Sequence, residues 1–361
     1  MKSRTHLARV AVTAVLVFAM GCRSYFLADE PSDAGGGNAE VGAADASVTA
    51  KARRIYVYGG SPDGVTLPEE PMAHYAEILP DGLLGPWRAA PKPPTSMIWH
   101  SSAQGRDFIA LLSGIARPHG GNLKIFVGSV ADGAVTSFVT SPDLFPNPIH
   151  HGASLIRGDV LYVMGGQIGD DKPPTADVWR SAITATTFAP PVRVTPLPAP
   201  VARMAMAEGA GSVFLVGGTD QNNANTTSIL RARFQVDGSL STFEAQTPLP
   251  SGRRYLAAAV HRSSLLVVGG QAVEEIDNVL TCPIDASGNV APCVETTALP
   301  EPRSRHRAVI HDGRLYVVGG RTKSGGKDVL VGDLNDEGGI VGWRNTSPLP
   351  TSAIYTTLLL L

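Results

Sequence analysis

The segment Leu161-Tyr-Val-Met-Gly-Gly166 is one of six apolar runs that end in glycine and recur along the chain. The other five are Arg54-Ile-Tyr-Val-Tyr-Gly-Gly60, Phe108-Ile-Ala-Leu-Leu-Ser-Gly114, Val213-Phe-Leu-Val-Gly-Gly218, Leu265-Leu-Val-Val-Gly-Gly270 and Leu315-Tyr-Val-Val-Gly-Gly320. Their last glycines are 54, 52, 52, 52 and 50 residues apart. Such runs predict strands buried on both faces, and the glycines permit positive φ and close backbone approach. A spacing this regular indicates a repeat architecture.

Further signals follow in most units. Asp-Gly pairs between alternating segments predict hairpins at Asp81-Gly82, Asp132-Gly133 and Asp237-Gly238. A bulky aromatic residue then closes several units: Trp87, Phe138, Phe188, Phe243 and Trp343. A proline-containing link follows, as in Leu197-Pro198, Leu249-Pro250, Leu299-Pro300 and Leu349-Pro350. Four strands in each of six units predict an all-β, six-bladed β-propeller.

These units resemble the kelch motif, in which an apolar strand and Gly-Gly are followed by a Trp or Phe and then by Leu-Pro-x-x-Arg. The resemblance covers Lys51 to Leu361 and implies a kelch-type propeller at residues 53–361. Such a propeller is similar to the central domain of galactose oxidases. The sequence departs from the motif at Ser113-Gly114 and in mostly lacking the tyrosine before the Trp.

The two ends of this region complement each other. Residues 352–361 occupy the place of a first, innermost strand with no second strand after it, whereas Arg54–Gly60 is a second strand with no first. Pairing the C-terminal strand with the N-terminal strand would complete one blade and cover both strand edges.

The first residues of the chain predict an export signal. Lys2, Arg4 and Arg9 precede or flank the apolar run Val10–Met20, which is too short to span a bilayer. Ala19-Met20-Gly21-Cys22 resembles the lipobox of bacterial lipoproteins, although Ala19 stands where leucine is usual. This resemblance implies a signal peptide at residues 1–21 and lipidation of Cys22. The alternative is an ordinary secretory signal with an incidental cysteine.

Residues 22–52 are rich in glycine, alanine, serine and aspartate and have little apolar periodicity. We expect a flexible tether, because this composition cannot offset the entropy of ordering. The protein is then expected to be exported and lipid-anchored to the bacterial outer membrane, on its periplasmic or cell-surface side.

Cys282 and Cys293 are expected to form a disulfide. A two-residue turn at Ser287-Gly288 would place them opposite each other on a hairpin, and export would allow the bond to form. A metal pair is the alternative, but two thiols without further ligands make a poor site.

The charge balance argues against a nucleic-acid partner. Thirty Lys and Arg residues face 32 Asp and Glu residues, a net charge of −2, so the chain lacks the positive field that such a partner requires. We expect a monomer that contacts the membrane only through its lipid anchor.

Aligning the units on their glycine pairs reveals two columns at the start of the innermost strands. The first column contains large residues that can form hydrogen bonds: Trp99, His151, Arg203, Tyr255, Arg305 and Tyr355. The second, two positions later, is mostly small: Ser101, Ala153, Ala205, Ala257, Arg307 and Thr357. Residues just after the glycine pairs should reach the same end: Gln167, Thr219, Gln271 and Arg321. Small residues suit a narrow channel and large ones its mouth.

This ring predicts a ligand-binding site at the propeller mouth. Arg203, Arg305 and Arg321 suit a carboxylate or an anionic sugar, and the aromatic residues could cover a sugar ring. In the alternative interpretation, the same residues wedge neighbouring blades apart and bond to backbone.

Signals for catalysis are poor. His150 and His151 are adjacent on a predicted strand and should point to opposite faces, so they are not expected to share a metal. We expect no metal and no cofactor, because no matching motif is present and the hairpin cysteines are ill-suited to the copper chemistry of galactose oxidases. The chain also resembles exported six-bladed sialic acid mutarotases, but the ring contains no acidic residue. Glu208, Glu274 and Glu275 could serve only if their loops fold inward.

The leading hypothesis is a membrane-tethered, non-catalytic kelch propeller that binds a glycan, a small anion, a peptide or a partner protein on the face carrying Trp99 and Arg305. The alternative is a mutarotase or epimerase that acts on a sugar's anomeric centre.

Overall fold

The computed structural model describes residues 53–361 except residues 113, 117–119 and 170–171. The predicted signal peptide, Cys22 and the tether lie outside the described residues. No helix in the described part of the chain is long and apolar enough to cross a bilayer.

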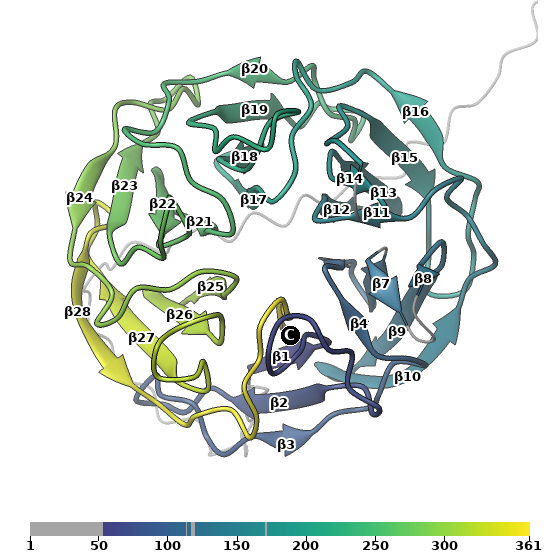
Figure 1. The fold of residues 1–361 in the computed structure, drawn as a ribbon, viewed down its shortest axis with the longest axis horizontal. Coiled ribbons are helices and arrows are strands. Elements are labelled where there is room, and N and C mark those ends of the chain that lie inside the picture. Colours follow the sequence, from purple (N-terminus) through teal and green to yellow (C-terminus); the bar gives the residue numbers. More distant parts are fainter. Residues whose placement is uncertain (1–52, 113, 117–119, 170–171) are drawn as a thin grey trace, which may run out of the picture. The chain divides into compact units, whose positions relative to one another are not determined.

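Six four-stranded antiparallel sheets surround a common axis (Figure 1). Blade 1 contains β29 (Thr357–Leu360), β1 (Arg54–Tyr58), β2 (Ala73–Glu77) and β3 (Arg88–Ala89). Blade 2 contains β5 (Ser101–Gln104), β6 (Phe108–Leu112), β9 (Ile125–Ala131) and β10 (Ala134–Thr140). Blade 3 contains β12 (Ala153–Arg157), β13 (Val160–Met164), β15 (Val178–Ala182) and β16 (Val192–Val194).

The remaining three blades repeat this pattern. Blade 4 contains β17 (Ala205–Gly209), β18 (Ser212–Val216), β19 (Ile229–Arg233) and β20 (Glu244–Ala245). Blade 5 contains β21 (Ala257–His261), β22 (Ser264–Val268), β23 (Val279–Pro283) and β24 (Val294–Thr296). Blade 6 contains β25 (Arg307–His311), β26 (Arg314–Val318), β27 (Val329–Leu334) and β28 (Ile340–Asn345). The predicted all-β, six-bladed architecture is confirmed.

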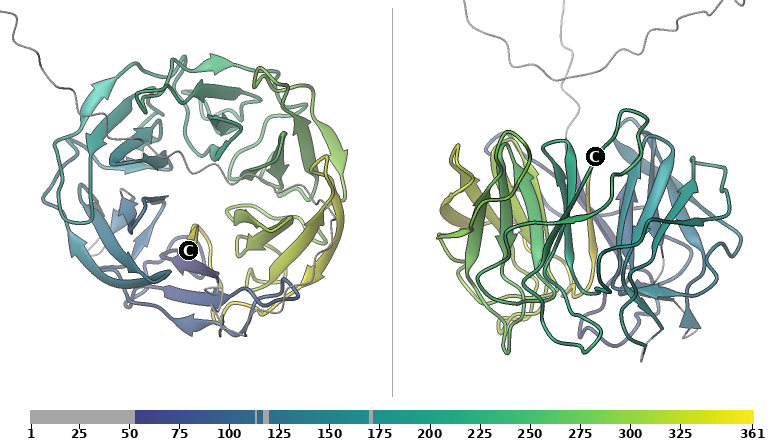
Figure 2. Two further views of the ribbon diagram at one scale, coloured as in Figure 1. Left: turned by 180° about the vertical axis from the view of Figure 1, so that it is seen from behind. Right: turned by 90° about the horizontal axis from the view of Figure 1, so that it is seen from above.

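Two small sheets each pair a link between blades with a loop inside the blade that follows. One pairs β11 (Ile149–His150) with β14 (Gln167–Ile168), and the other contains β4 (Met97–Ile98), β7 (Ile115–Ala116) and β8 (Gly120–Gly121). The side view shows the inner strands running between two ends that carry the loops (Figure 2). The glycine pairs lie at one of these ends, and we call this end the loop side. The strand side is the opposite direction along the axis, in which the inner strands run.

The two ends of the described chain meet in blade 1. Strand β29 pairs antiparallel with β1, from Tyr58 opposite Thr357 to Ile55 opposite Leu360. Arg54 and Leu361 add a reciprocal pair of backbone hydrogen bonds of 2.7 and 2.9 Å. The pairing that the sequence predicts is therefore present.

The apolar core lies between neighbouring blades. In one cluster, Ile55 and Val57 of β1 pack with Tyr316 and Val318 of β26, and all four side chains are fully buried. The stability of the propeller therefore depends on every blade having an apolar neighbour on both of its faces.

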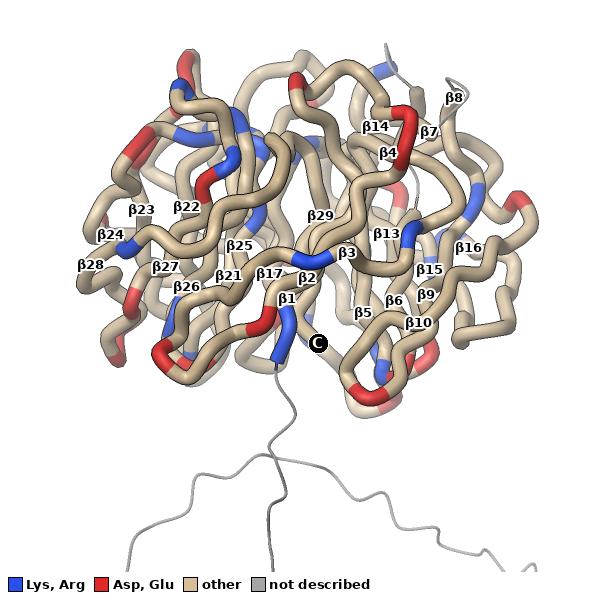
Figure 3. The backbone as a smooth tube through the Cα atoms, turned by 90° about the horizontal axis from the view of Figure 1, so that it is seen from below, with Lys and Arg blue, Asp and Glu red and all other residues tan. Residues whose placement is uncertain are grey.

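Acidic and basic residues are interspersed on the side shown in Figure 3.

The glycine pairs join each blade to the next. The N–H of the last glycine in each blade donates to a carbonyl in the following link: Gly60 to Met97, Gly114 to Ile149, Gly166 to Val201, Gly218 to Arg253, Gly270 to Arg303 and Gly320 to Ala353. At Gly166, φ is 92° and a Cβ would lie 2.7 Å from the carbonyl oxygen of His150. Any other residue there would combine strain with a backbone clash.

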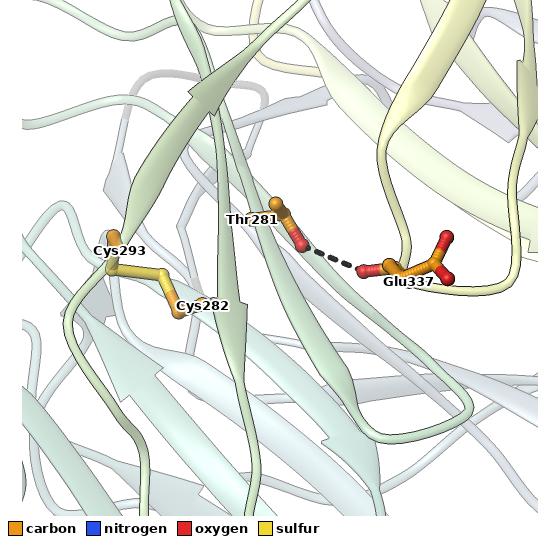
Figure 4. The surroundings of a disulfide bond; sticks show 4 residues. All are labelled: Thr281, Cys282, Cys293 and Glu337. Atoms are coloured by element: carbon orange, nitrogen blue, oxygen red, sulfur yellow. Dashed lines mark hydrogen bonds between the residues drawn. A yellow bond between two sulfur atoms is a disulfide. The ribbon is translucent and has the colours of Figure 1, made fainter.

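Cys282 and Cys293 form the predicted disulfide (Figure 4). The turn differs from the predicted two-residue turn at Ser287-Gly288. The N–H of Gly288 donates to the carbonyl of Asp285, and the Asp285 carboxylate accepts the N–H groups of Ser287 and Asn289. The carboxylate therefore favours a turn centred one residue earlier, with Gly288 at φ 82° after it.

Two histidines are buried beside the inner strands. His100 is 2% exposed and His306 is 0% exposed. Burial, aided by the charge of Arg307, lowers the pKa of His100 to about 3. Burial, followed by the charge of Arg303, lowers the pKa of His306 well below its usual value. Both imidazoles are neutral in the folded protein at neutral pH.

These histidines predict instability in acid. Below a pH of about 6.5 the unfolded chain takes up protons that folded His100 does not, so stability is lost as the pH falls toward 3. At pH 5, His100 alone should lower the free energy of unfolding by about 2 kcal/mol. Urea unfolding of His100→Gln between pH 7.5 and 5 should show a loss smaller by about that amount. His261→Gln, a partly exposed control, should change the slope much less, and an unchanged slope for His100→Gln would contradict the assignment.

The pairing of the chain ends predicts that deletion of residues 352–361 abolishes cooperative folding, because β1 loses its inner partner and blade 6 loses a neighbour. Thermal unfolding followed by near-UV circular dichroism measures this. The control is a ten-residue deletion within residues 23–49, which lie outside the described residues. A truncated chain that melts like the full chain would refute the role of β29.

Candidate functional site

The structure brings the first column of large residues together around the propeller axis. We call these six residues the axial ring: Trp99, His151, Arg203, Tyr255, Arg305 and Tyr355. Each lies two positions before an inner strand and has φ between 55° and 60°. Positive φ costs a residue other than glycine about 1 kcal/mol or more, so six equivalent cases indicate a conformation imposed by the surroundings.

Backbone hydrogen bonds connect the ring residues in sequence. The N–H groups of His151, Arg203, Tyr255, Arg305 and Tyr355 each donate to the carbonyl of the preceding ring residue, over 2.8 to 3.2 Å. The left-handed conformation turns each N–H toward one neighbouring blade and each carbonyl toward the other. The ring is therefore a belt of backbone bonds at the inner edge of the blades.

Three alternate ring side chains meet one another. The ring centroids of His151, Tyr255 and Tyr355 form a triangle with sides of 5.6, 5.4 and 5.4 Å. Trp99 packs beside it, 5.0 Å from His151 and 6.1 Å from Tyr355. Aromatic rings at these separations are in contact. We call His151, Tyr255 and Tyr355 the aromatic plug, because they leave no passage between them.

The two ring arginines bond to the plug. The Nε of Arg203 donates to the Tyr255 hydroxyl and the Nε of Arg305 to the Tyr355 hydroxyl, each over 2.7 Å. The Arg305 guanidinium also lies 4.3 Å from the Tyr255 ring centroid. These contacts hold the guanidinium groups against the aromatic faces.

On the loop side, the ring arginines have further polar partners. Arg203 donates to the side chains of Thr219 and Asn223, each over 3.0 Å. Arg305 donates to Gln271 over 3.1 Å and to Glu275 over 3.2 Å. Gln271 and Thr219 thus reach the ring, as the sequence predicts for residues just after the glycine pairs.

Glu275 is an acidic residue that contacts the ring, although the sequence alone does not predict this contact. Its loop folds inward, so that one carboxylate oxygen accepts from Arg305 and from the Ser304 hydroxyl, and Arg321 lies 3.7 Å away. Glu208 is instead paired with Arg157, and Glu274 is exposed. An isolated β-bridge joins Gln271 and Glu275 within this loop.

Two predicted positions behave differently from expectation. Gln167 is buried and its amide donates to the Lys172 carbonyl, within its own loop. His150 and His151 do not point to opposite faces of a strand: β11 ends at His150, His151 adopts positive φ, and both imidazoles approach the Trp99 ring, at 5.9 and 5.0 Å. The change of backbone conformation at His151 breaks the strand alternation that the prediction assumes.

Two of the plug groups, His151 and Tyr355, are uncharged at neutral pH. Burial, followed by the charge of Arg203, lowers the pKa of His151 well below its usual value. Burial, followed by the proximity of Tyr255, raises the pKa of Tyr355. The described residues contain no group of three or more His, Cys, Asp or Glu side chains placed to hold a metal ion.

A cavity of about 180 Å³ lies on the strand side of the ring, and we call it the axial cavity. Five ring residues line it: His151, Arg203, Tyr255, Arg305 and Tyr355. Every other lining residue follows a ring residue by one to three positions: Ser101, Ser102, Gly152, Ala153, Ser154, Met204, Met206, Leu256, Arg307, Ala308, Thr357 and Leu358. The lining contains three arginines and no carboxylate, and the loop residues Gln271, Glu275 and Arg321 are not part of it.

Arg307 is the one arginine of the cavity lining that the predicted site does not include. The sequence contains a signal for it, because it is the one large residue in the otherwise small second column. The sequence predicts that the second column lines a narrow channel, whereas in the structure residues of this column line the cavity.

Known proteins resemble this chain in sequence and in fold. The KLHDC2/KLHL20/DRC7 Kelch-repeats domain matches residues 99–320. The solved structure of YjhT is similar, with a TM-score of 0.60 and 13% identity, over 76% of this chain and 91% of that chain. No curated protein matches the sequence. At this identity the YjhT structure supports the fold alone, whereas the domain match covers more than half of the chain. The chain therefore belongs to the kelch-repeat family.

Proposed function

We propose that the protein is an exported, membrane-tethered and non-catalytic kelch binding module, and that its ligand occupies the axial cavity. The supporting observation is that five of the six ring residues line this one cavity. A volume of about 180 Å³ is below that of pockets for drug-sized molecules, so the ligand is small: a sugar unit, a small organic anion, or the end of a peptide.

The two sides of the ring differ in what they offer a ligand. On the loop side, Arg305, Gln271 and Glu275 bond to one another, and Arg203 is engaged by Thr219 and Asn223. On the strand side, the ring faces a cavity lined by hydroxyl groups, apolar side chains and Arg307. A ligand on the strand side gains contacts without breaking that network.

Tethering rests on the N-terminal sequence, in which a basic start, an apolar run and Gly21-Cys22 precede a polar stretch. Two acyl chains on Cys22 would hold the propeller at a membrane while leaving its binding site in water.

A sugar mutarotase or epimerase is the second candidate, and Glu275 favours it. This carboxylate lies within hydrogen-bond distance of ring residue Arg305, and the neutral imidazole of His151 lines the cavity. The non-catalytic function remains preferred because Glu275 does not line the cavity and its oxygen already accepts two hydrogen bonds.

A ligand screen with three variants tests the proposal. Monosaccharides, sugar acids and small carboxylates are added to the full chain, and binding is measured by thermal shift and calorimetry. Arg203→Ala should weaken a ligand about tenfold to a hundredfold, because it removes a charge-assisted hydrogen bond. Ser101→Leu should block binding by filling the cavity. Arg321→Ala, on the loop side, distinguishes the two sides of the ring.

Loss of binding in Ser101→Leu with retention in Arg321→Ala supports the cavity. The reverse result places the ligand on the loop side and refutes the cavity assignment. For any sugar that binds, exchange NMR between its anomers separates the two functions. Acceleration of that exchange by the protein, lost in Glu275→Gln, would replace the binding module with the enzyme.

A further inference from the structure

Arg307 is the exception in a column of small residues that faces the axis. The equivalent residues in the other blades are Ser101, Ala153, Ala205, Ala257 and Thr357. Arg307 begins β25, two positions after Arg305, and lines the axial cavity. One blade thus places a guanidinium where five blades place a side chain no larger than threonine.

The chain supplies little compensation for this charge. The Nε of Arg307 donates to the Thr356 carbonyl over 3.0 Å. Within the described residues it forms no ion pair, whereas the nearby Arg303 pairs with Asp328 and Arg305 with Glu275. Burial accordingly lowers the pKa of Arg307. A cation partly removed from water without a counter-charge is costly, and an anion in the cavity would offset that cost.

The rest of the cavity wall suits such an anion. Arg203 and Arg305 also line the cavity, although Arg305 is already paired with Glu275, and the described lining contains no Asp or Glu to repel an anion. Ser101, Ser102 and Ser154 contribute hydroxyl groups to the lining. Met204, Met206, Leu256 and Leu358 provide apolar surface. The wall therefore matches a ligand with one anionic group and a small, partly hydroxylated body.

We propose that the axial cavity binds a small organic carboxylate, of the size of a sugar acid or smaller, and that Arg307 is its principal charge partner. This inference rests on the proposed function, since it names the ligand class of the same cavity. Arg307 fits a carboxylate because its terminal N–H groups can donate to both oxygens. The aromatic plug closes the loop side, so the ligand enters from the strand side.

The test compares D-glucuronate with D-glucose, which differ by the carboxylate, and uses acetate as a minimal anion. Binding to the full chain is measured by calorimetry and by the rise in Tm. We expect glucuronate to bind at least about tenfold more tightly than glucose, and Arg307→Gln to remove that preference. Arg307→Lys should retain part of it. Arg233→Gln, at the exposed end of β19, removes a charge far from the ring and should change nothing.

A second comparison separates a binding role from a structural one. Without ligand and at low salt, Arg307→Gln should melt no lower than the wild type, because it removes an uncompensated charge. Arg303→Gln should melt clearly lower, because it breaks a buried ion pair. If Arg307→Gln lowers Tm as much as Arg303→Gln, Arg307 is a structural residue and the inference is overturned.

The remaining outcomes also decide. Failure of both glucuronate and acetate to raise the Tm of the wild type overturns the inference, as does equal binding of glucuronate by Arg307→Gln and the wild type. Equal binding of glucose and glucuronate that is lost in Ser101→Leu overturns the anion preference while upholding the cavity as the ligand site.

Discussion

The whole propeller depends on the close approach of a glycine pair to backbone from two blades. The last glycine of each apolar run, five of which end in a glycine pair and one in Ser113-Gly114, donates its N–H to the link of the next blade, and these six bonds run around the axis. The same glycine sits against the backbone that flanks a ring residue, as Gly166 does at His150. Because no Cβ fits there, the spacing of glycines along the chain sets both the number of blades and the position of the ring.

The site is a consequence of this constraint. Six links held at the glycine pairs must turn sharply into the inner strands, and each does so through a ring residue with positive φ. Six large side chains then converge on one axis, where three meet as the aromatic plug. The small residues that follow leave space behind the plug. The fold and the site therefore both follow from the links held at the glycines. The plug closes the loop side, and the cavity lies beside the small side chains that follow the ring residues.

The sequence predicts the fold well because its signals are local and repeated. Glycine pairs, Asp-Gly hairpins and Leu-Pro links mark the strand boundaries of most units, and the unpaired halves at the two ends predict the pairing of β29 with β1. It also identifies all six ring residues. It does not predict how they are used, because the inward fold of the Glu275 loop, the mutual packing of the plug and the cavity at Arg307 depend on contacts between different blades.

The central claim is that the ring is closed on the loop side and open to an anion on the strand side. An anomalous difference map from a bromide-soaked crystal tests it directly, since bromide marks sites for small anions. The account predicts a peak in the axial cavity beside the Arg307 guanidinium, with the plug rings in contact above it. An empty cavity with bromide bound instead at Arg321 on the loop side would contradict the account.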